Sequence, residues 1–225
     1  MLFLAIRFPR KGRLMNKDKE RCSIVVYKIV KGIVDLLCSL IGIVILFPLF
    51  LIISILIKAS SKGPVFFVQE RIGINGRKFK LYKFRTMVNN AEDLIASFTP
   101  EQKKEWKENF KLVDDPRITK IGKFLRKTSL DELPQLINIF KGDMSFVGPR
   151  SIIDEELLWY GDQKEKLLTL KPGLTGWWAV NGRSNVPYPE RCDLELYYVD
   201  HFSLYLDIVI IFRTIGAIIK KDGAR

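Results

Sequence analysis

The chain has 225 residues and a formal net charge of +12, from 37 lysines and arginines against 25 aspartates and glutamates. Its 48% hydrophobic content excludes a disordered chain, and its length suits one compact domain with attachments. Three widely separated cysteines and a single histidine, His201, argue against a disulfide framework or a zinc site. The positive charge calls for an acidic partner, which could be anionic lipid, nucleic acid or a phosphorylated small molecule.

Residues 1–27 form a basic N-terminal tail. Its apolar start, residues 2–6, is too short for the core of a secretory signal and runs directly into four basic residues. We therefore expect no secretory signal here. Met1 and Met15 are both candidate start residues.

The next segment, predicted as a membrane helix over residues 28–62, contains 22 consecutive uncharged residues at 36–57. As a helix this stretch would be about 33 Å long, enough to cross a bilayer. Pro48 lies near its middle and predicts a kink or break. Basic residues flank both ends, so the positive-inside rule gives no orientation. A kinked single span and a re-entrant segment that turns at Pro48 both fit this pattern.

Residues 63–203 follow the membrane segment and are predicted to form the soluble part of the chain. Its first part contains two strand-like stretches, 64–69 and 79–85, on either side of the turn signal Asn75-Gly76, which predicts a β-hairpin. Lysines and arginines alternate with aromatic residues in the second strand, a pattern also found in nucleic-acid-binding proteins. Because no nucleic-acid-binding motif accompanies it and an uncharged segment precedes it, we expect no nucleic-acid partner.

Helical patterns follow the hairpin. Residues 91–110 are charged and predict a helix on the surface of the domain, and a second helix follows Asp115-Pro116, with its apolar residues on one face. Residues 204–225 predict a C-terminal amphipathic helix, because apolar residues recur there at helical spacing. Such a helix can lie on a membrane surface or pack in an ordinary core.

Two adjacent carboxylates stand out in the stretch TSLDELPQ, residues 128–135. Ser129 and Glu132 fit a capping box, and Pro134 is tolerated only near the start of a helix. Asp131 and Glu132 should therefore lie in or beside a first helical turn, where the helix dipole favours their ionised forms. This position suits a helix cap, and it also suits a nucleophilic carboxylate beside a divalent cation.

Two loop-like segments, residues 142–150 and 171–183, are rich in glycine, proline and arginine. Glycines allow backbone N–H groups to approach phosphate oxygens, and arginines clamp phosphate with two donors. Together with the acidic pair, these loops predict a diphosphate site with cationic clamps, a metal-binding carboxylate and a second carboxylate able to attack phosphorus.

Several long motifs together resemble one family, the bacterial sugar transferases, which are monotopic polyprenol-phosphate phosphoglycosyl transferases. The resemblance runs from about residue 28 to the C-terminus, and its motifs are YKFRTM at 82–87, DPRITKIGKFLRKTSLDELPQLINIFKGDMSFVGPR at 115–150, KPGLTGWWAVNGR at 171–183 and LELYYVDHFSLYLDIVIIFRTI at 194–215. It implies a membrane-anchored α+β enzyme, mostly helical, that transfers a sugar 1-phosphate from a UDP-sugar to undecaprenyl phosphate and releases UMP.

The resemblance also implies roles for single residues. Asp131 matches the nucleophile that forms a covalent phosphosugar intermediate, and Glu132, with Asp131 beside it, matches the magnesium site. Pro48 matches the break of a re-entrant membrane helix. Phosphate or substrate binding is assigned to Arg126, Arg150, Arg183, Lys83 and Arg85.

The resemblance implies that residues 63–203 are a cytoplasmic catalytic domain at the bacterial inner membrane, in exopolysaccharide, capsule or other glycan synthesis. Besides UDP-sugar, undecaprenyl phosphate and membrane lipid, the expected partners include a second copy of the chain and downstream glycosyltransferases. Galactose or glucose is the expected sugar. The chain departs from the family pattern at Phe47, Ser151 and Trp178-Ala179, and none of these positions touches the acidic pair.

Two other readings of the same residues stay open. In the first, the enzyme works by a single displacement, and Asp131 is a base that never becomes a covalent partner. In the second, the chain is a non-catalytic, basic scaffold bound to the membrane.

Overall fold

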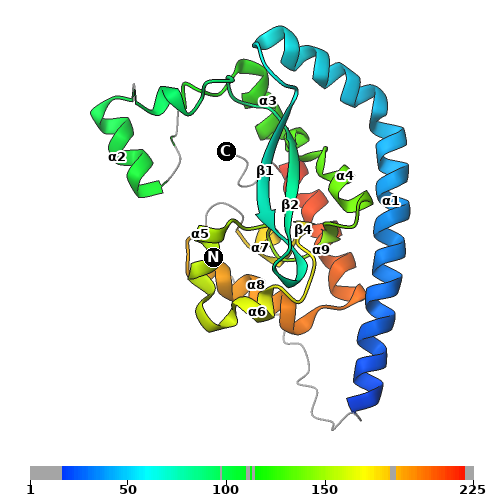
Figure 1. Ribbon diagram of the computed structural model, residues 1–225. Coiled ribbons are helices and arrows are strands. Elements are labelled where there is room, and N and C mark those ends of the chain that lie inside the picture. Colours follow the sequence, from blue (N-terminus) through cyan, green and yellow to red (C-terminus); the bar gives the residue numbers. More distant parts are fainter. Residues whose placement is uncertain (1–16, 97, 110–111, 113–114, 183–185, 221–225) are drawn as a thin grey trace.

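The computed structural model describes residues 17–96, 98–109, 112, 115–182 and 186–220. It is a mostly helical α+β structure in which one long helix, α1 (Lys17–Ser60), runs along one side of all the other elements (Figure 1). The other α-helices are α2 (Pro100–Asn109), α3 (Lys120–Thr128), α4 (Gln135–Phe140), α5 (Asp154–Leu157), α6 (Lys164–Leu167), α7 (Trp177–Val180), α8 (Glu190–His201) and α9 (Leu204–Lys220). Short 3₁₀ helices are η1 (Ile74–Gly76), η2 (Asp93–Ile95), η3 (Leu130–Glu132) and η4 (Leu158–Gln163).

Helix α1 corrects two predictions about the membrane segment. It begins at Lys17 and not at residue 28, so part of the predicted basic tail is helical. It also continues through Pro48, where a break was predicted. Figure 1 shows its axis turning in the C-terminal half, the half that contains this proline. A proline removes one helical hydrogen bond and its ring crowds the preceding turn, which is sufficient to bend a helix without ending it.

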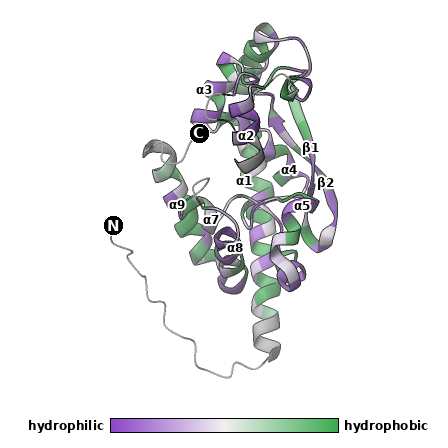
Figure 2. Cartoon of the chain, turned by 90° about the vertical axis from the view of Figure 1, so that its left-hand side faces the viewer, coloured by the Kyte–Doolittle hydropathy of each residue, from purple (hydrophilic) through white to green (hydrophobic). Residues whose placement is uncertain are grey.

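One face of α1 packs against the rest of the chain along most of the length of the helix. Tyr27, Asp35 and Ser39 are buried toward the N-terminal half, and Ile53 and Ile57 are buried toward the C-terminal end. The opposite face exposes many large apolar side chains, and α1 is long and apolar enough to cross a membrane. Figure 2 shows this hydrophobic character along α1. The helix is therefore suited to anchor the chain in a membrane.

The predicted hairpin is confirmed. Strands β1 (Phe66–Ile72) and β2 (Lys78–Phe84) pair antiparallel, with the turn where the sequence indicated it. Asn75 and Gly76 both have positive φ angles, 55° and 76°, the conformation that asparagine and glycine tolerate best. The N–H of Gly73 donates to the carbonyl of Arg77 at 2.8 Å and closes the turn.

The two glycine-rich loops lie side by side, because each contains one strand of a small parallel sheet, β3 (Ser145–Val147) and β4 (Gly173–Thr175). Several of their glycines serve the packing of the two loops, and the predicted approach to phosphate stays a prediction. A Cβ atom on Gly173 would lie 2.1 Å from the backbone nitrogen of Gly148, and one on Gly176 would lie 2.1 Å from the carbonyl oxygen of Gly148. These glycines let the two loops approach each other, and this packing sets the position of the residues that follow β3.

Helix α9 begins at Leu204, as predicted for the C-terminal helix. It buries Leu206 and Ile210, while a second apolar face remains exposed. The exposed side chains are those of the predicted stripe within the described part of the helix, with one tyrosine added, namely Leu204, Tyr205, Ile208, Ile211, Phe212 and Ile215. This arrangement favours a membrane-surface helix over a purely core helix.

Candidate active site

A cavity of about 1190 Å³ opens between the hairpin, the segment that follows it, α3 and the two loops. Its wall includes most of the residues that the sequence assigned to the site, although they come from distant parts of the chain. These are Lys83, Arg85, Arg126, Asp131, Glu132 and Arg150. Arg183 lies outside the described residues. The fold therefore brings the acidic pair and four of the five predicted cationic residues to one cavity.

The acidic pair lies in a tight connection between α3 and α4. Ser129 ends α3 with a left-handed backbone (φ 58°), which is uncommon for a residue with a side chain, and Asp131 and Glu132 follow in the 3₁₀ helix η3. The predicted capping box is wrong, because the side chain of Ser129 makes no capping bond to this helix. The prediction for Pro134 is confirmed, since it is the N-cap of α4.

Apolar neighbours orient the side chains of the acidic pair. Leu130 and Leu133 pack on a core cluster that includes Phe84 and Leu125. These leucines turn toward the core. The two residues between them, Asp131 and Glu132, therefore face the other way and line the cavity. The core therefore determines the direction of the reactive groups.

The environment of Asp131 brings the pKa of its carboxyl group close to neutral pH. Burial, with a smaller contribution from the charge of Glu132, raises the pKa of Asp131 to about 6, although Lys83 and Arg126 act in the opposite direction. The amino group of Lys83 lies 2.7 Å from Oε1 of Glu132. At pH 7 Asp131 is therefore mostly ionised, and its raised pKa makes its carboxylate more basic than that of an ordinary solvated aspartate.

Arg126 is held beside the acidic pair by a residue that the sequence analysis missed. Its Nε donates to Oγ1 of Thr86 at 2.9 Å. Helix α3 can approach Thr86 because residue 122 is glycine, and a Cβ atom there would lie 1.9 Å from the carbonyl oxygen of Thr86. Thr86 belongs to the motif YKFRTM, so the sequence could have marked it as a candidate. Its contact with α3 could not be predicted from the sequence.

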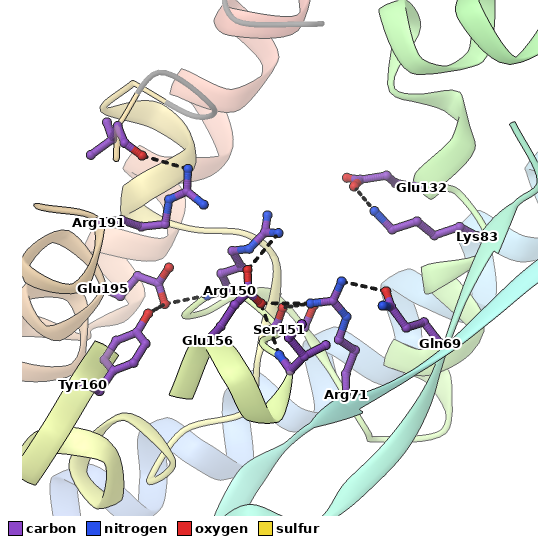
Figure 3. A network of polar contacts seen from close by, with 12 residues as sticks. Gln69, Arg71, Lys83, Glu132, Arg150, Ser151, Glu156, Tyr160, Arg191 and Glu195 are labelled. Carbon is purple, nitrogen blue, oxygen red and sulfur yellow. Dashed lines mark hydrogen bonds and ion pairs between the residues drawn. The ribbon is translucent and has the colours of Figure 1, made fainter. Parts of the chain in front are cut away.

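A second group of charged residues surrounds two arginines of the cavity wall, Arg71 and Arg150 (Figure 3). Arg150 follows β3, and its backbone N–H donates to Oε2 of the fully buried Glu195 at 3.3 Å. The guanidinium of Arg150 lies 5.4 Å from the ring of Trp178 and 3.7 Å from a carboxylate oxygen of Glu156. Arg71, from β1, shares this carboxylate at 3.1 Å. Arg71, Glu156 and Glu195 were not predicted from the sequence.

Arg85, a predicted phosphate-binding residue, contacts the chain itself. Its guanidinium donates to the carbonyl oxygens of Lys62 and Ser61, at 2.9 and 2.8 Å. These bonds join the end of β2 to the segment that follows α1. They fix the connection between the membrane helix and the hairpin, and the assignment of Arg85 to phosphate stays a prediction.

The acidic pair has the chemistry of a magnesium site. Among the residues that the structure describes, no three histidine, cysteine, aspartate or glutamate side chains gather as metal ligands. Magnesium, however, commonly binds through one or two carboxylates together with phosphate oxygens of a substrate. Asp131 and Glu132 provide two adjacent carboxylates in a partly buried position, where their mutual repulsion favours a divalent cation. The residues present therefore fit magnesium bound together with a diphosphate.

Comparison with known proteins identifies the family. Residues 26–221 match the family model described as bacterial sugar transferase. The chain is 44% identical over 193 residues to the exopolysaccharide production protein ExoY of Sinorhizobium fredii, an alignment covering 84% of this chain and 85% of that protein. The chain belongs to the bacterial sugar transferase family, and it is an enzyme, as the resemblance of its motifs predicted.

Two further relatives carry names that state a reaction. The undecaprenyl-phosphate galactose phosphotransferase of Salmonella typhimurium is 40% identical over 215 residues, covering 94% of this chain and 44% of that protein. The UDP-N-acetylgalactosamine-undecaprenyl-phosphate N-acetylgalactosaminephosphotransferase of Aeromonas hydrophila is 37% identical over 210 residues, covering 89% of this chain and 46% of that protein. The chain thus spans most of ExoY and under half of each of these two longer proteins.

Proposed function

We propose that this chain transfers a sugar 1-phosphate from a UDP-sugar to undecaprenyl phosphate and releases UMP. The observation that carries the proposal is the position of Asp131, a partly buried carboxylate in a cavity, beside a second carboxylate and within the electrostatic influence of Lys83 and Arg126. A diphosphate needs positive charge around it and a nucleophile at its sugar-bearing phosphorus, and this cavity offers both. The names of the relatives from Salmonella typhimurium and Aeromonas hydrophila support the same reaction class.

The proposed reaction has two displacements at one phosphorus atom. A carboxylate oxygen of Asp131 attacks the phosphorus that carries the sugar, the bond from that phosphorus to the bridging oxygen breaks, and UMP leaves with the electron pair. A phosphate oxygen of undecaprenyl phosphate then attacks the same phosphorus. The bond to Asp131 breaks, and the carboxylate is regenerated. Atoms and charge balance without a further reactant.

The other groups of the site act on charge and orientation. Arg126, fixed by Thr86, lies where positive charge stabilises both the ionised Asp131 and the phosphoryl group under attack. Magnesium bound at Glu132, with Asp131 beside it, would neutralise charge on the diphosphate when present. Lys83 contacts Glu132 and holds this side chain in the cavity.

Contacts along α1 support a monotopic arrangement, and we propose that it lies on the cytoplasmic face of the bacterial inner membrane. Lys31 lies 2.6 Å from Asp207 of α9, and Asp35 accepts a hydrogen bond from the backbone N–H of Phe146 in β3. A helix that crossed the bilayer would carry these partners into hydrocarbon at high cost. We infer that only the outer apolar face of α1 meets lipid and that the chain enters and leaves by one face.

Such an anchor would hold the cavity at headgroup level. Undecaprenyl phosphate could then present its phosphate to Asp131 while its polyprenyl chain stays in the membrane. The membrane helix thereby supplies part of the proximity that the second displacement needs.

Release of UMP tests the reaction directly. The full chain in nanodiscs is incubated with undecaprenyl phosphate, magnesium and each of a panel of UDP-sugars. We expect release of UMP with UDP-galactose or UDP-glucose, and the printed name of the Salmonella typhimurium relative favours galactose. A chain that releases no UMP from any sugar of the panel would contradict the proposal and favour the scaffold reading.

Isotope exchange separates the two-step reaction from a single displacement. Without lipid acceptor, labelled UMP is mixed with the chain and the UDP-sugar. The two-step reaction passes label into the UDP-sugar, because formation of the aspartyl intermediate is reversible. A single displacement cannot exchange label until the acceptor is present. Absence of exchange would therefore favour the single displacement, in which Asp131 acts as a base.

A further inference from the structure

Two arginines from distant strands share one carboxylate on the wall of the cavity. Arg71 lies in β1 and Arg150 follows β3, and both line the cavity that contains the acidic pair. Glu156 joins them, because its Oε2 lies 3.1 Å from Nη1 of Arg71 and its Oε1 lies 3.7 Å from Nη2 of Arg150. In Figure 3 this group lies apart from Lys83 and Glu132, which occupy the other side of the view.

Two guanidinium groups meet at a single carboxylate here. Those of Arg71 and Arg150 both contact Glu156. Burial, and next the positive charge of Arg150, lower the pKa of Arg71, so the two guanidinium groups repel each other. An anion bound between them would relieve this repulsion.

The two arginines differ in how firmly they are held. Arg71 donates through Nη1 to the carbonyl of Ser151 at 3.1 Å and through Nη2 to Oε1 of Gln69 at 2.7 Å, in addition to its bond with Glu156. These bonds fix its plane. Within the part of the chain that the structure describes, the guanidinium of Arg150 is oriented only by the long contact with Glu156 and by the ring of Trp178, so its terminal nitrogens can serve a ligand. A fixed guanidinium, that of Arg71, beside one whose N–H donors can turn toward a ligand, that of Arg150, is a suitable arrangement for binding phosphate.

We propose that Arg71 and Arg150, positioned by Glu156, form a phosphate-binding subsite separate from the acidic pair. The subsite itself follows from the charges and contacts on this wall, and only the identity of its ligand rests on the proposed function. That reaction offers two phosphate groups that would need it, the phosphate of departing UMP and the phosphate of the incoming lipid. Both are phosphate monoesters that present several anionic oxygens to the same donors.

Binding of inorganic pyrophosphate to the full chain in nanodiscs tests the subsite without any turnover. Calorimetry should show binding to the wild type that Arg71→Gln weakens by about 10-fold or more, the usual effect of losing a charge-assisted hydrogen bond. Lys78→Gln is the matched control, because Lys78 is a cation of the same hairpin that contacts Glu70 and Asp154 away from the cavity. Absence of pyrophosphate binding to the wild type, or an equal loss with Lys78→Gln, would overturn the subsite.

A double variant separates ligand binding from a merely structural ion pair. Arg71→Gln alone leaves the charge of Glu156 without its partner Arg71, and Arg71→Gln/Glu156→Gln removes that charge as well. The new side-chain amide at position 156 can still accept the hydrogen bond that Glu156 accepts from the backbone N–H of Ile153. If Arg71 only neutralised Glu156, the double variant would regain wild-type affinity, and the proposal would fail. We expect the loss of affinity to persist, with melting temperatures close to that of the wild type.

UMP and farnesyl phosphate, a short and soluble lipid phosphate, identify the source of the ligand. A loss confined to UMP assigns the subsite to the nucleotide, a loss confined to farnesyl phosphate assigns it to the acceptor, and a loss for both indicates that the two occupy it in turn. If Arg71→Gln changes neither affinity, the subsite is refuted. A chain that binds pyrophosphate through Arg71 but releases no UMP would keep the subsite and refute the proposed function.

Discussion

The two charged walls of the cavity are built in different ways. Asp131 and Glu132 come from one short connection between two helices. The adjacent Leu130 and Leu133 pack inward and orient the two carboxylates. The wall with Arg71 and Arg150 is assembled from separate strands and held by buried carboxylates. The difference indicates a division of work, in which the first wall performs the chemistry and the second binds and positions phosphate.

The largest effect is expected on the acidic wall. Asp131→Asn keeps the size of the side chain but removes the nucleophile, so UMP release should fall at least about 10³-fold, while affinity for the UDP-sugar stays close to that of the wild type. Steady-state UMP release and calorimetry measure the two quantities. Asp200→Asn, at an exposed carboxylate that pairs with Lys166, is the control and should leave both unchanged. An equal loss in the control would mean that Asp131 has no special role.

The next effect belongs to the arginine wall. Arg150→Gln should lower kcat/KM for UMP release by about 10²-fold, because it removes a charged donor from the phosphate. We expect most of the loss in KM, in contrast to Asp131→Asn. A loss confined to kcat would contradict the division of work between the two walls. Titration with UDP-sugar at fixed acceptor separates the two parameters.

A smaller effect tests the support of Arg126. Thr86→Val has a similar shape but removes the hydroxyl that accepts from Nε of Arg126, so we expect UMP release to fall by about 10-fold. Thr86→Ser restores the acceptor and should restore most of the rate. If the serine variant is as slow as the valine variant, the methyl group matters and the hydrogen bond does not.

The mildest effect is on stability and concerns Glu195. Burial raises the pKa of its carboxyl to about 7 from the usual 4.5, although Tyr160, Arg150 and Arg191 counteract this. The folded state thus binds this proton more tightly than the unfolded state. The resulting stabilisation is complete below pH 4.5 and is lost as the pH rises through about 7.

Glu195→Gln cannot titrate, so comparison with the wild type isolates this term. From pH 5 to pH 8 the free energy of unfolding of the wild type should fall by about 2 kcal/mol relative to the variant. Denaturant titrations at the two pH values measure the difference. A difference that does not change with pH would show that Glu195 keeps its ordinary pKa.

Local features of the sequence predicted the parts of the fold that depend on local contacts. The turn at Asn75-Gly76 and the helix start at Pro134 follow from backbone preferences of single residues, and both are confirmed. The acidic pair was found because it is contiguous. The left-handed backbone of Ser129 was not predicted, because S-x-x-E is compatible with a capping box and only the packing of Leu130 and Leu133 decides against it.

The arginine wall depends on contacts between distant segments. Arg71 was one basic residue among several in a predicted strand, and nothing local distinguished it from Lys78. Its role depends on Glu156, which is 85 residues away and reaches it across the fold. The glycines of the two loops were predicted to let the backbone approach phosphate, and their close contact with the other loop was not predicted because it joins separate segments. The continuity of α1 through Pro48 also depends on packing, since the helix is held on both sides of the proline.

The central claim is that Asp131 becomes covalently esterified by the sugar phosphate. The most direct measurement is intact-protein mass spectrometry of the chain after incubation with magnesium and UDP-galactose in the absence of lipid acceptor, followed by peptide mapping. The account predicts an added mass of one hexose phosphate on the peptide that contains Asp131, removed when undecaprenyl phosphate is added and absent in Asp131→Asn. Turnover of the wild type with no such adduct, or an adduct that persists in Asp131→Asn, would contradict it.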